Sequence, residues 1–323
     1  MPRFIIQHVT RYTYESPVTD STNAILLYPL KDELQELVHQ QLNITGEPNI
    51  DVHTDYYGNR VGAFMNIAPH YELKIDSKVE VITRPRIFPE DTESAAEQWA
   101  ALKQLHNNVS FIDFLRQENF PALAEVKAIA DAGFYEAVSV YVAVLQLTEY
   151  VYKNFKYIQG ITSIETTVDE IWKLKAGVCQ DFAHILLVML RLLCIPARYV
   201  SGYVCPKNEG MRGEGATHAW VEAYLPFYGW LGFDPTNNCI VNELHVRLAI
   251  GRNFSDCSPV RGTYKGTAKQ TLEVGVSVVY EDGERSKSLN AVMKPQPVLS
   301  NPVDENINSY RRHMEMMQQQ QQQ

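Results

Sequence analysis

Residues 175–204 form the stretch KAGVCQDFAHILLVMLRLLCIPARYVSGYV, which contains the longest apolar run of the chain. The run would be apolar on nearly every side of a helix, and this pattern is typical of a buried central helix rather than a surface helix. We expect the helix to run from about Cys179 to Leu193, between Gly177 and the helix-terminating Pro196. A single thiol therefore stands in the first turn of a buried helix.

A thiol at this place has a chemical use. Unpaired backbone N–H groups and the helix macrodipole stabilise an anion at a helix N-terminus, so they would stabilise the thiolate of Cys179. Gly177 would let the backbone turn and a substrate carbonyl approach, and the N–H of Cys179 would point at the oxyanion formed there. The alternative is a buried structural thiol, which the position of Cys179 alone does not exclude.

A nucleophilic thiol needs a partner base, and the chain has nine histidines. His184 lies five residues after Cys179, so a helix would point its ring away from the thiol, and we expect a buried core histidine. His218 instead begins the alternating segment HAWVEAYL (218–225), which predicts a strand directly after the glycine-rich loop 205–217. His218 is therefore the predicted base. The remaining histidines are His8, His39, His53, His70, His106, His245 and His313.

Asp234 is the predicted partner of His218. It lies in a second strand pattern, WLGFDPT (230–236), which follows the turn LPFYG. If His218 and Asp234 face each other across a hairpin, the centre of the hairpin falls midway between them, at Pro226, inside that turn. Asp234 would then select the tautomer of His218 and support its positive charge. The alternative is a simple turn that ends the strand at Asp234–Pro235.

The chain divides into four segments of different character. Residues 1–85 alternate with a period of two in FIIQHVTRYTYE and ELKIDSKVEVIT, which predicts an all-β sandwich domain without catalytic groups. Residues 86–154 have helical spacing and predict a helical connector packed on the next domain. Residues 155–282 hold the candidate catalytic residues, and residues 283–323 form a polar tail that ends in six glutamines. The expected fold class is α+β, with a central helix packed on an antiparallel sheet in the second domain.

Composition limits the classes of function. The 323 residues are 45% hydrophobic and 21% charged, as in globular proteins. The net charge is −9 and Lys and Arg are scattered, which argues against nucleic acid as a partner. No apolar run could span a bilayer and the first residues lack a signal-peptide core, so we expect a cytoplasmic protein without a membrane partner. The sequence carries no signature of an oligomeric state.

The cysteines favour neither a disulfide framework nor a metal site. Their number is odd, at five, and no C-x-x-C motif is present. We therefore expect no metal. Apart from Cys179, we expect the thiols to act as small buried hydrophobes, namely Cys194, Cys205, Cys239 and Cys257.

The segments GVCQDFAH, LCIPARYVSGY, THAWVEAY and GWLGFDPT together resemble the bacterial transglutaminase-like superfamily, a papain-related group of cysteine enzymes. The resemblance extends to HVTRYTYESPVTDS, DYYGN and APHYEL in the first domain and to GRNFSDCSPVRGTYKG at 251–266, so it covers about residues 1–282. It implies a papain-like catalytic domain after an N-terminal β-domain, acyl transfer through a thioester, and no metal or organic cofactor. The family's catalytic Cys, His and Asp fall on Cys179, His218 and Asp234.

The resemblance also bears on the cleft around Cys179. Related enzymes often place an aromatic or amide oxyanion donor upstream of the nucleophile, which makes Tyr157, in FKYIQG, a candidate. Gln180 is a second candidate, and Trp220 and Trp230 would wall the cleft. The alternatives are a half-buried tyrosine without a catalytic role and tryptophans that belong to the core.

Three functions are compatible with these residues. A cysteine hydrolase would resolve the thioester with water, a transglutaminase would resolve it with an amine, and a binding module on the same fold would do neither. The complete set of Cys, His and Asp argues against the binding module. We expect hydrolysis of peptide or protein amides, because the loop 205–217 has little apolar volume with which to exclude water.

Overall fold

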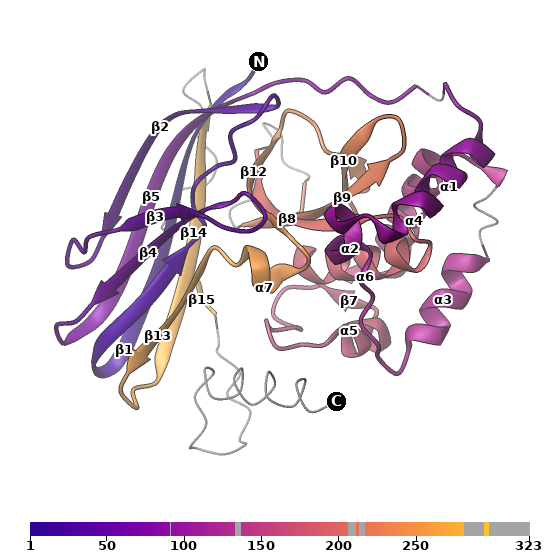
Figure 1. Cartoon of the computed structure of the whole chain (residues 1–323). Coiled ribbons are helices and arrows are strands. Elements are labelled where there is room, and N and C mark those ends of the chain that lie inside the picture. Colours follow the sequence, from indigo (N-terminus) through magenta and orange to yellow (C-terminus); the bar gives the residue numbers. More distant parts are fainter. Residues whose placement is uncertain (91, 133–136, 206–210, 213–216, 281–293, 297–323) are drawn as a thin grey trace.

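The chain folds into a strand-rich part and a mixed part of helices and strands, which lie side by side (Figure 1). The computed structural model describes residues 1–323 except 91, 133–136, 206–210, 213–216, 281–293 and 297–323. Most of the loop 205–217 and of the tail 283–323 therefore lies outside the described residues. The predicted α+β fold class, with an all-β part at the N-terminus, is confirmed.

Eight strands form the first part of the fold. They are β1 (Arg3–Ile25), β2 (Gln35–Ile44), β3 (Asp51–Thr54), β4 (Arg60–Asn66), β5 (His70–Thr83), β13 (Val260–Lys265), β14 (Gln270–Tyr280) and β15 (Lys294–Gln296). The long strand β1 pairs with β5 and β14 along its first half and with β4 and β13 along its second half. Apolar side chains from both halves meet in one buried cluster, so these strands form a sandwich.

Side-chain alternation explains why β1 and β5 lie where they do. Phe4 and Ile6 of β1 and Ile75 and Val79 of β5 point into the sandwich and are at most 2% exposed. Each buried side chain of this size contributes about 1.5–3 kcal/mol relative to its exposed state. The alternation predicted from the sequence is thus confirmed for both strands.

Two strands near the end of the chain differ from the expected division. β13 and β14 pair with β1, with the β14 register running from Phe4–Tyr280 to Tyr14–Gln270, although the sequence predicts residues 155–282 as one catalytic domain. The physical reason is that β1 has two hydrogen-bonding edges, and β5 covers only one of them. The chain therefore returns to the sandwich after the mixed part and covers the other edge.

The mixed part combines an antiparallel sheet with helices. The sheet has the order β11 (Cys239–Ile240), β10 (Gly229–Asp234), β9 (His218–Leu225), β8 (Ala197–Val204), β12 (His245–Gly251). A short parallel pair joins β6 (Lys156–Tyr157) to β7 (Ala176–Gly177). The helices are α1 (Ala95–Gln104), α2 (Val109–Leu115), α3 (Leu123–Asp131), α4 (Val140–Asn154), α5 (Val168–Leu174), α6 (Cys179–Leu192) and α7 (Phe254–Cys257), with a 3-10 turn at Leu105–Asn107.

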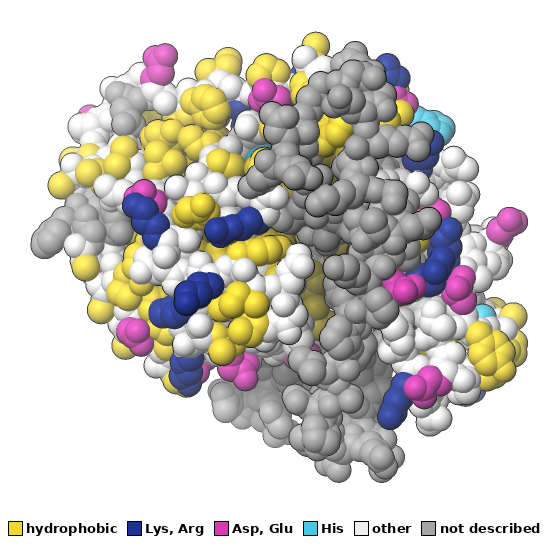
Figure 2. Space-filling view, turned by 180° about the vertical axis from the view of Figure 1, so that it is seen from behind, with side chains coloured by type: hydrophobic (Ala, Val, Ile, Leu, Met, Phe, Trp, Pro, Cys, Tyr) yellow, Lys and Arg dark blue, Asp and Glu magenta, His cyan; other side chains and the backbone are white. Residues whose placement is uncertain are grey.

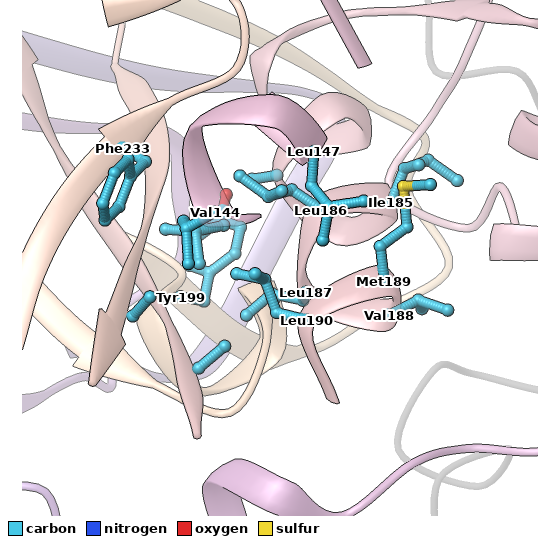
Figure 3. Packing of buried hydrophobic residues seen from close by; sticks show 14 of the residues in the cluster. Val144, Leu147, Ile185, Leu186, Leu187, Val188, Met189, Leu190, Tyr199 and Phe233 are labelled. Carbon is cyan, nitrogen blue, oxygen red and sulfur yellow. The ribbon is translucent and has the colours of Figure 1, made fainter. Parts of the chain in front are cut away.

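The helix α6 is the centre of the mixed part, as its sequence predicts. Its residues 185–190 are buried against Val144 and Leu147 of α4 and against Tyr199 and Phe233 of the sheet (Figure 3). The helix α4 lies in the segment 86–154, predicted as a helical connector packed on the next domain, and it belongs to the same core. The reason is that a helix that is apolar on all sides needs neighbouring helices as well as a sheet to cover it.

Two amide side chains connect the sandwich to the mixed part. Asn59 Nδ2 donates to the carbonyl of Ile250 and Asn59 Oδ1 accepts from its N–H, each at 2.8 Å. Gln35 makes the same pair of contacts with the backbone of Arg247, at 2.9 and 2.8 Å. Both backbone partners belong to β12, the edge strand of the second sheet. The two amides thus satisfy this free edge as a neighbouring strand would.

Charged side chains are spread over the face shown in Figure 2. Single Lys and Arg side chains lie apart on that face, with Asp and Glu among them. The visible part of this face therefore offers no continuous basic stripe.

Among the described helices, none combines the length and hydropathy that a membrane span requires.

The free energy of unfolding should depend on pH because two histidines are buried. His184 is a core histidine, as expected, and burial lowers the pKa of both His8 and His184 from 6.5 to about 4. Both rings are neutral in the folded protein, whereas the unfolded chain binds protons below pH 6.5. The free energy of unfolding should therefore fall between pH 6.5 and pH 4, by up to about 3 kcal/mol for each histidine. Urea unfolding at about pH 7 and about pH 4.5 measures this loss.

A matched pair of variants isolates the contribution of His8. Its ring lies between the hydroxyls of Tyr203, 3.0 Å from Nδ1, and Thr10, 3.1 Å from Nε2, and glutamine can form similar hydrogen bonds without titrating. His39 is exposed on β2. The pH dependence should weaken in His8→Gln and stay unchanged in His39→Gln. An equally steep loss of stability in His8→Gln would contradict the assignment.

Candidate active site

Cys179 is the first residue of α6 and lies half-buried beside the start of β9. Its backbone follows the parallel pair in which Gly177 of β7 lies beside Tyr157 of β6. The Sγ atom lies 3.9 Å from the carbonyl oxygen of Thr217, the residue before His218. The fold therefore brings the predicted nucleophile and the predicted base together.

His218 and Asp234 form a buried hydrogen-bonded pair. His218 Nε2 lies 2.7 Å from Asp234 Oδ2, and both side chains are fully buried. Because Nε2 is committed to the carboxylate, Nδ1 is the nitrogen left for Cys179. Nδ1 is buried without a hydrogen-bond partner at normal distance among the described residues, and Cys179 is near enough to affect the pKa of His218.

The interaction between His218 and Asp234 favours the charged form of both side chains. Burial by itself would lower the pKa of His218, but the charge and hydrogen bond of Asp234, and then Cys179, raise it well above its ordinary value. Burial would raise the pKa of Asp234, but His218 and then His245 hold it well below its usual range. An imidazolium beside a carboxylate results, and such an imidazolium can stabilise a thiolate.

The hairpin that joins β9 to β10 has a different register from the predicted one. Its paired residues are centred on Phe227, whereas the prediction places the centre at Pro226. The turn forms where Phe227 (φ 66°) and Gly229 (φ 108°) adopt left-handed conformations. His218 and Asp234 are therefore diagonal rather than directly opposite. They still share a face because the partner position shifts by two residues, which is one full side-chain period.

The turn after β10 and a second histidine surround Asp234. Its Oδ1 accepts from the backbone N–H groups of Thr236 (2.9 Å) and Asn237 (3.3 Å), and its Oδ2 accepts from Asn237 Nδ2 at 2.7 Å. His245 Nε2 lies 3.5 Å from the same Oδ2. The sequence alone points to no role for Asn237 or His245. The run Asp-Pro-Thr-Asn is a turn signal that could have found Asn237, whereas nothing local singles out His245.

Asp181 shapes the start of α6, and the sequence does not single it out. Asp181 is buried, and its Oδ2 accepts from the N–H of Val178 (2.7 Å) and from the hydroxyl of Thr162 (2.6 Å). A Cβ on Gly177 would lie 2.3 Å from this oxygen. Glycine is therefore needed at 177 to make room for Asp181, which holds the backbone just before Cys179.

Lys175, rather than Gly177, ends the helix that precedes β7. The helix α5 begins with a capping box of Thr167 and Glu170, and its C-cap is Lys175 in the left-handed conformation (φ 48°). The ammonium group of Lys175 lies over the ring of Trp172. This cation–π contact helps to offset the strain of a non-glycine residue in that conformation.

The four predicted cleft residues lie in different places. Tyr157 is near the thiol: burial, and next the charge of Cys179, raise the pKa of Tyr157. Gln180 is half-buried in the first turn of α6. Trp220 is fully buried behind His218, with ring centroids 6.2 Å apart. Trp230 packs at the other end of β10, away from Asp234, against Phe111, Phe114 and Tyr224.

Two of the four remaining cysteines are buried as predicted. Cys205 and Cys257 are buried and Cys239 is half-buried, but Cys194 is exposed. Cys194 follows the last residues of α6 in the left-handed conformation (φ 58°). The next residue, Ile195, donates its N–H to the carbonyl of Leu190, as in a Schellman motif. This turn carries the Cys194 thiol out of the core.

Comparison with known proteins places the chain in a family. Residues 128–235 match the transglutaminase-like superfamily, and residues 4–82 match the bacterial transglutaminase-like N-terminal region. An uncharacterised protein of Mycobacterium leprae is 32% identical over 286 residues, which cover 86% of this chain and 99% of that relative. This chain belongs to the transglutaminase-like superfamily.

Two other proteins extend the comparison. The solved structure of a candidate cysteine protease from Cytophaga hutchinsonii has a TM-score of 0.72 at 24% identity, and the match covers 94% of this chain and 95% of that one. A protein-glutamine gamma-glutamyltransferase of Pseudomonas aeruginosa is 34% identical over 80 residues, 23% of this chain and 12% of that protein. The first match supports the fold along nearly the whole chain.

One group of side chains at this transglutaminase-like site has atoms of metal-ligand type. Asp234, Cys239 and His245 each place one such atom within 4.8 Å of the others. Hydrogen bonds already engage the carboxylate of this group. Oδ2 of Asp234 already accepts from His218 and Asn237 at 2.7 Å. Burial, and then the charge of Asp234, raise the pKa of Cys239 to about 12, so a metal ion would have to displace this proton as well as those hydrogen bonds.

Proposed function

We propose that this chain is a cysteine-dependent acyl-transfer enzyme that hydrolyses amide or peptide bonds through a thioester. Cys179 is the nucleophile, His218 is the general base and acid, and Asp234 is the orienting carboxylate. The observation that supports this most is the buried contact of 2.7 Å between His218 and Asp234, which leaves the other ring nitrogen for the thiol at the N-terminus of α6.

Acylation begins at the thiol. The Sγ atom of Cys179 attacks the amide carbon while its proton resides on Nδ1 of His218. As the C–N bond breaks, the imidazolium donates that proton to the departing amine, and the acyl group stays on sulfur as a thioester. The backbone N–H of Cys179 and the hydroxyl of Tyr157 are the proposed donors to the oxyanion that forms in between.

Water completes the reaction. His218 removes a proton from a water molecule, whose oxygen attacks the thioester carbon. The C–S bond then breaks, the free acid leaves, and Cys179 returns as a thiolate beside the imidazolium. Water is far more concentrated than any amine, so an amine product requires a channel from which water is excluded. The higher concentration of water therefore supports hydrolysis as the first proposal.

Transamidation is the second candidate, because the Pseudomonas aeruginosa relative is named a protein-glutamine gamma-glutamyltransferase. Mass analysis of the products separates the two. A small peptide amide is supplied together with a millimolar primary amine. We expect the free acid as the main product, and no product from Cys179→Ala. A main product that contains the amine, and that Cys179→Ala does not form, would replace hydrolysis by transamidation.

Peptide or protein amides are the proposed substrates, and the cytoplasm is the proposed location. All five cysteines are free thiols in the structure, and free thiols suit a reducing compartment. Fractionation of cells that produce the tagged chain tests the location, and recovery of the protein outside the cytoplasm would contradict it.

A further inference from the structure

Asp234 lies between two histidines, and the proposed function uses only one of them. Nε2 of His218 and Nε2 of His245 lie 2.7 Å and 3.5 Å from the same carboxylate oxygen, Oδ2. Both imidazole rings are fully buried. His245 comes from the first position of β12, which is separated from β10 by two other strands of the sheet. A polar side chain buried at this place requires a hydrogen-bonded role.

The neighbours of His245 favour one tautomer. Nδ1 lies 3.4 Å from the backbone N–H of Asn242, which can only donate to it. The side-chain oxygen of Asn242, 3.3 Å away, is an alternative partner, but it already accepts from the N–H of Leu244 at 2.9 Å. A proton on Nδ1 would also aim the lone pair of Nε2 at the carboxylate of Asp234. The proton therefore belongs on Nε2, which lies 3.5 Å from Oδ2 and has no hydrogen bond of normal geometry to any described residue.

Trp220 holds the two imidazole rings in place. Its ring meets that of His245 edge to face, with centroids 5.3 Å apart and planes at 79°, and it is tilted by 35° to that of His218 at 6.2 Å. Trp220 is itself fully buried. Packing against this buried ring limits the motion of both imidazoles and keeps Nε2 of His245 near the carboxylate.

The two histidines differ in charge state because their surroundings shift their pKa values in opposite directions. Burial lowers the pKa of His245, and the charges of His218 and Arg86 oppose the effect of Asp234 in raising it. The pKa of His218 is instead raised, as described above. The half-buried thiol of Cys239 is a further titratable group beside Asp234 and His245, and Cys179 lies beside His218. One ring is therefore a cation and the other is neutral, and both lie beside the same carboxylate.

We propose that His245 is a positioning residue of the active site: its neutral ring donates Nε2–H to Asp234 and holds that carboxylate in line with His218. This inference rests on the proposed function. It adds that the orienting carboxylate is itself oriented by a second histidine. A hydrogen bond to a charged group is worth about 10- to 100-fold in an equilibrium or a rate, and the separation of 3.5 Å places His245 toward the lower end.

Two variants distinguish the hydrogen bond donated by Nε2 from the packing of the His245 ring, because each keeps one of the two polar positions of that ring. In His245→Asn the side-chain oxygen can replace Nδ1, but the amide is too short to reach Asp234; in His245→Gln the amide nitrogen can replace Nε2. The probe is the rate of Cys179 alkylation by iodoacetamide as a function of pH. His245→Asn should slow alkylation near neutral pH about tenfold and shift the acid side of the profile to higher pH, because a loosened Asp234 supports the imidazolium less. His245→Gln should retain most of the parental profile.

His184→Asn is the matched control, because His184 is also buried but receives the N–H of Phe254 instead of contacting Asp234. It should lose stability without a change in the alkylation profile. An unchanged profile in a less stable His245→Asn, or equal losses in the Asn and Gln variants, would overturn the positioning role in favour of simple packing. A parent protein without fast alkylation at Cys179 would contradict the proposed function itself, which distinguishes the two failures.

Discussion

Replacement of Cys179 by alanine should abolish amide hydrolysis and the fast alkylation of the protein by iodoacetamide. The reason is that His218 leaves one ring nitrogen for this thiol, at the N-terminus of a buried helix. Loss of the nucleophile should reduce turnover by at least about 1,000-fold, since binding and oxyanion stabilisation alone then remain. Peptide mass analysis after brief labelling at neutral pH identifies the modified cysteine and its rate.

Cys194 provides a stringent control for this experiment. It lies just beyond the opposite end of the same helix and is more exposed than Cys179. Exposure alone would make Cys194 the faster thiol, whereas an activated thiolate would make Cys179 faster. Cys194→Ala should therefore keep the fast phase. A fast phase that persists in Cys179→Ala and disappears in Cys194→Ala would assign the reactivity to exposure and remove the basis for catalysis.

Replacement of Asp234 by asparagine should leave the fold intact and lower turnover by about 1,000- to 10,000-fold. The amide is close in shape to the carboxylate, and its oxygen can still accept from the N–H groups of Thr236 and Asn237. Its nitrogen, however, would donate to Nε2 of His218. That contact moves the ring proton to Nδ1, so the nitrogen that serves Cys179 could no longer accept a proton. Steady-state turnover and a thermal unfolding curve measure the two effects separately.

Asp181→Asn is the comparison for this variant. Asp181 is also a buried carboxylate near Cys179, but a single oxygen accepts both of its hydrogen bonds, from Val178 and Thr162. The oxygen of an asparagine can accept the same two bonds. We expect this variant to fold and to hydrolyse amides. If Asp234→Asn were as active as the parent, Asp234 would have a structural role only, and its proposed role in orienting His218 would be wrong.

Local patterns in the sequence determined a large share of this structure. The period-two alternation predicted β1 and β5, because each strand buries one face whatever its neighbours are. The apolar run predicted α6 and its first turn at Cys179. Parity alone placed His218 and Asp234 on one face, and this survived an error in the hairpin register, because side chains alternate regardless of the exact pairing.

The tertiary structure alone decided which distant segments meet. It returned β14 to β1, drew α4 into the core around α6, and left Trp230 away from Cys179. It also brought His245 to Asp234, although β12 lies on the far edge of their common sheet. Spacing along the chain encodes the period of each element, because that period depends only on local geometry. Sheet order, register and side-chain contacts between elements depend on how the whole core is filled, and no single segment contains that information.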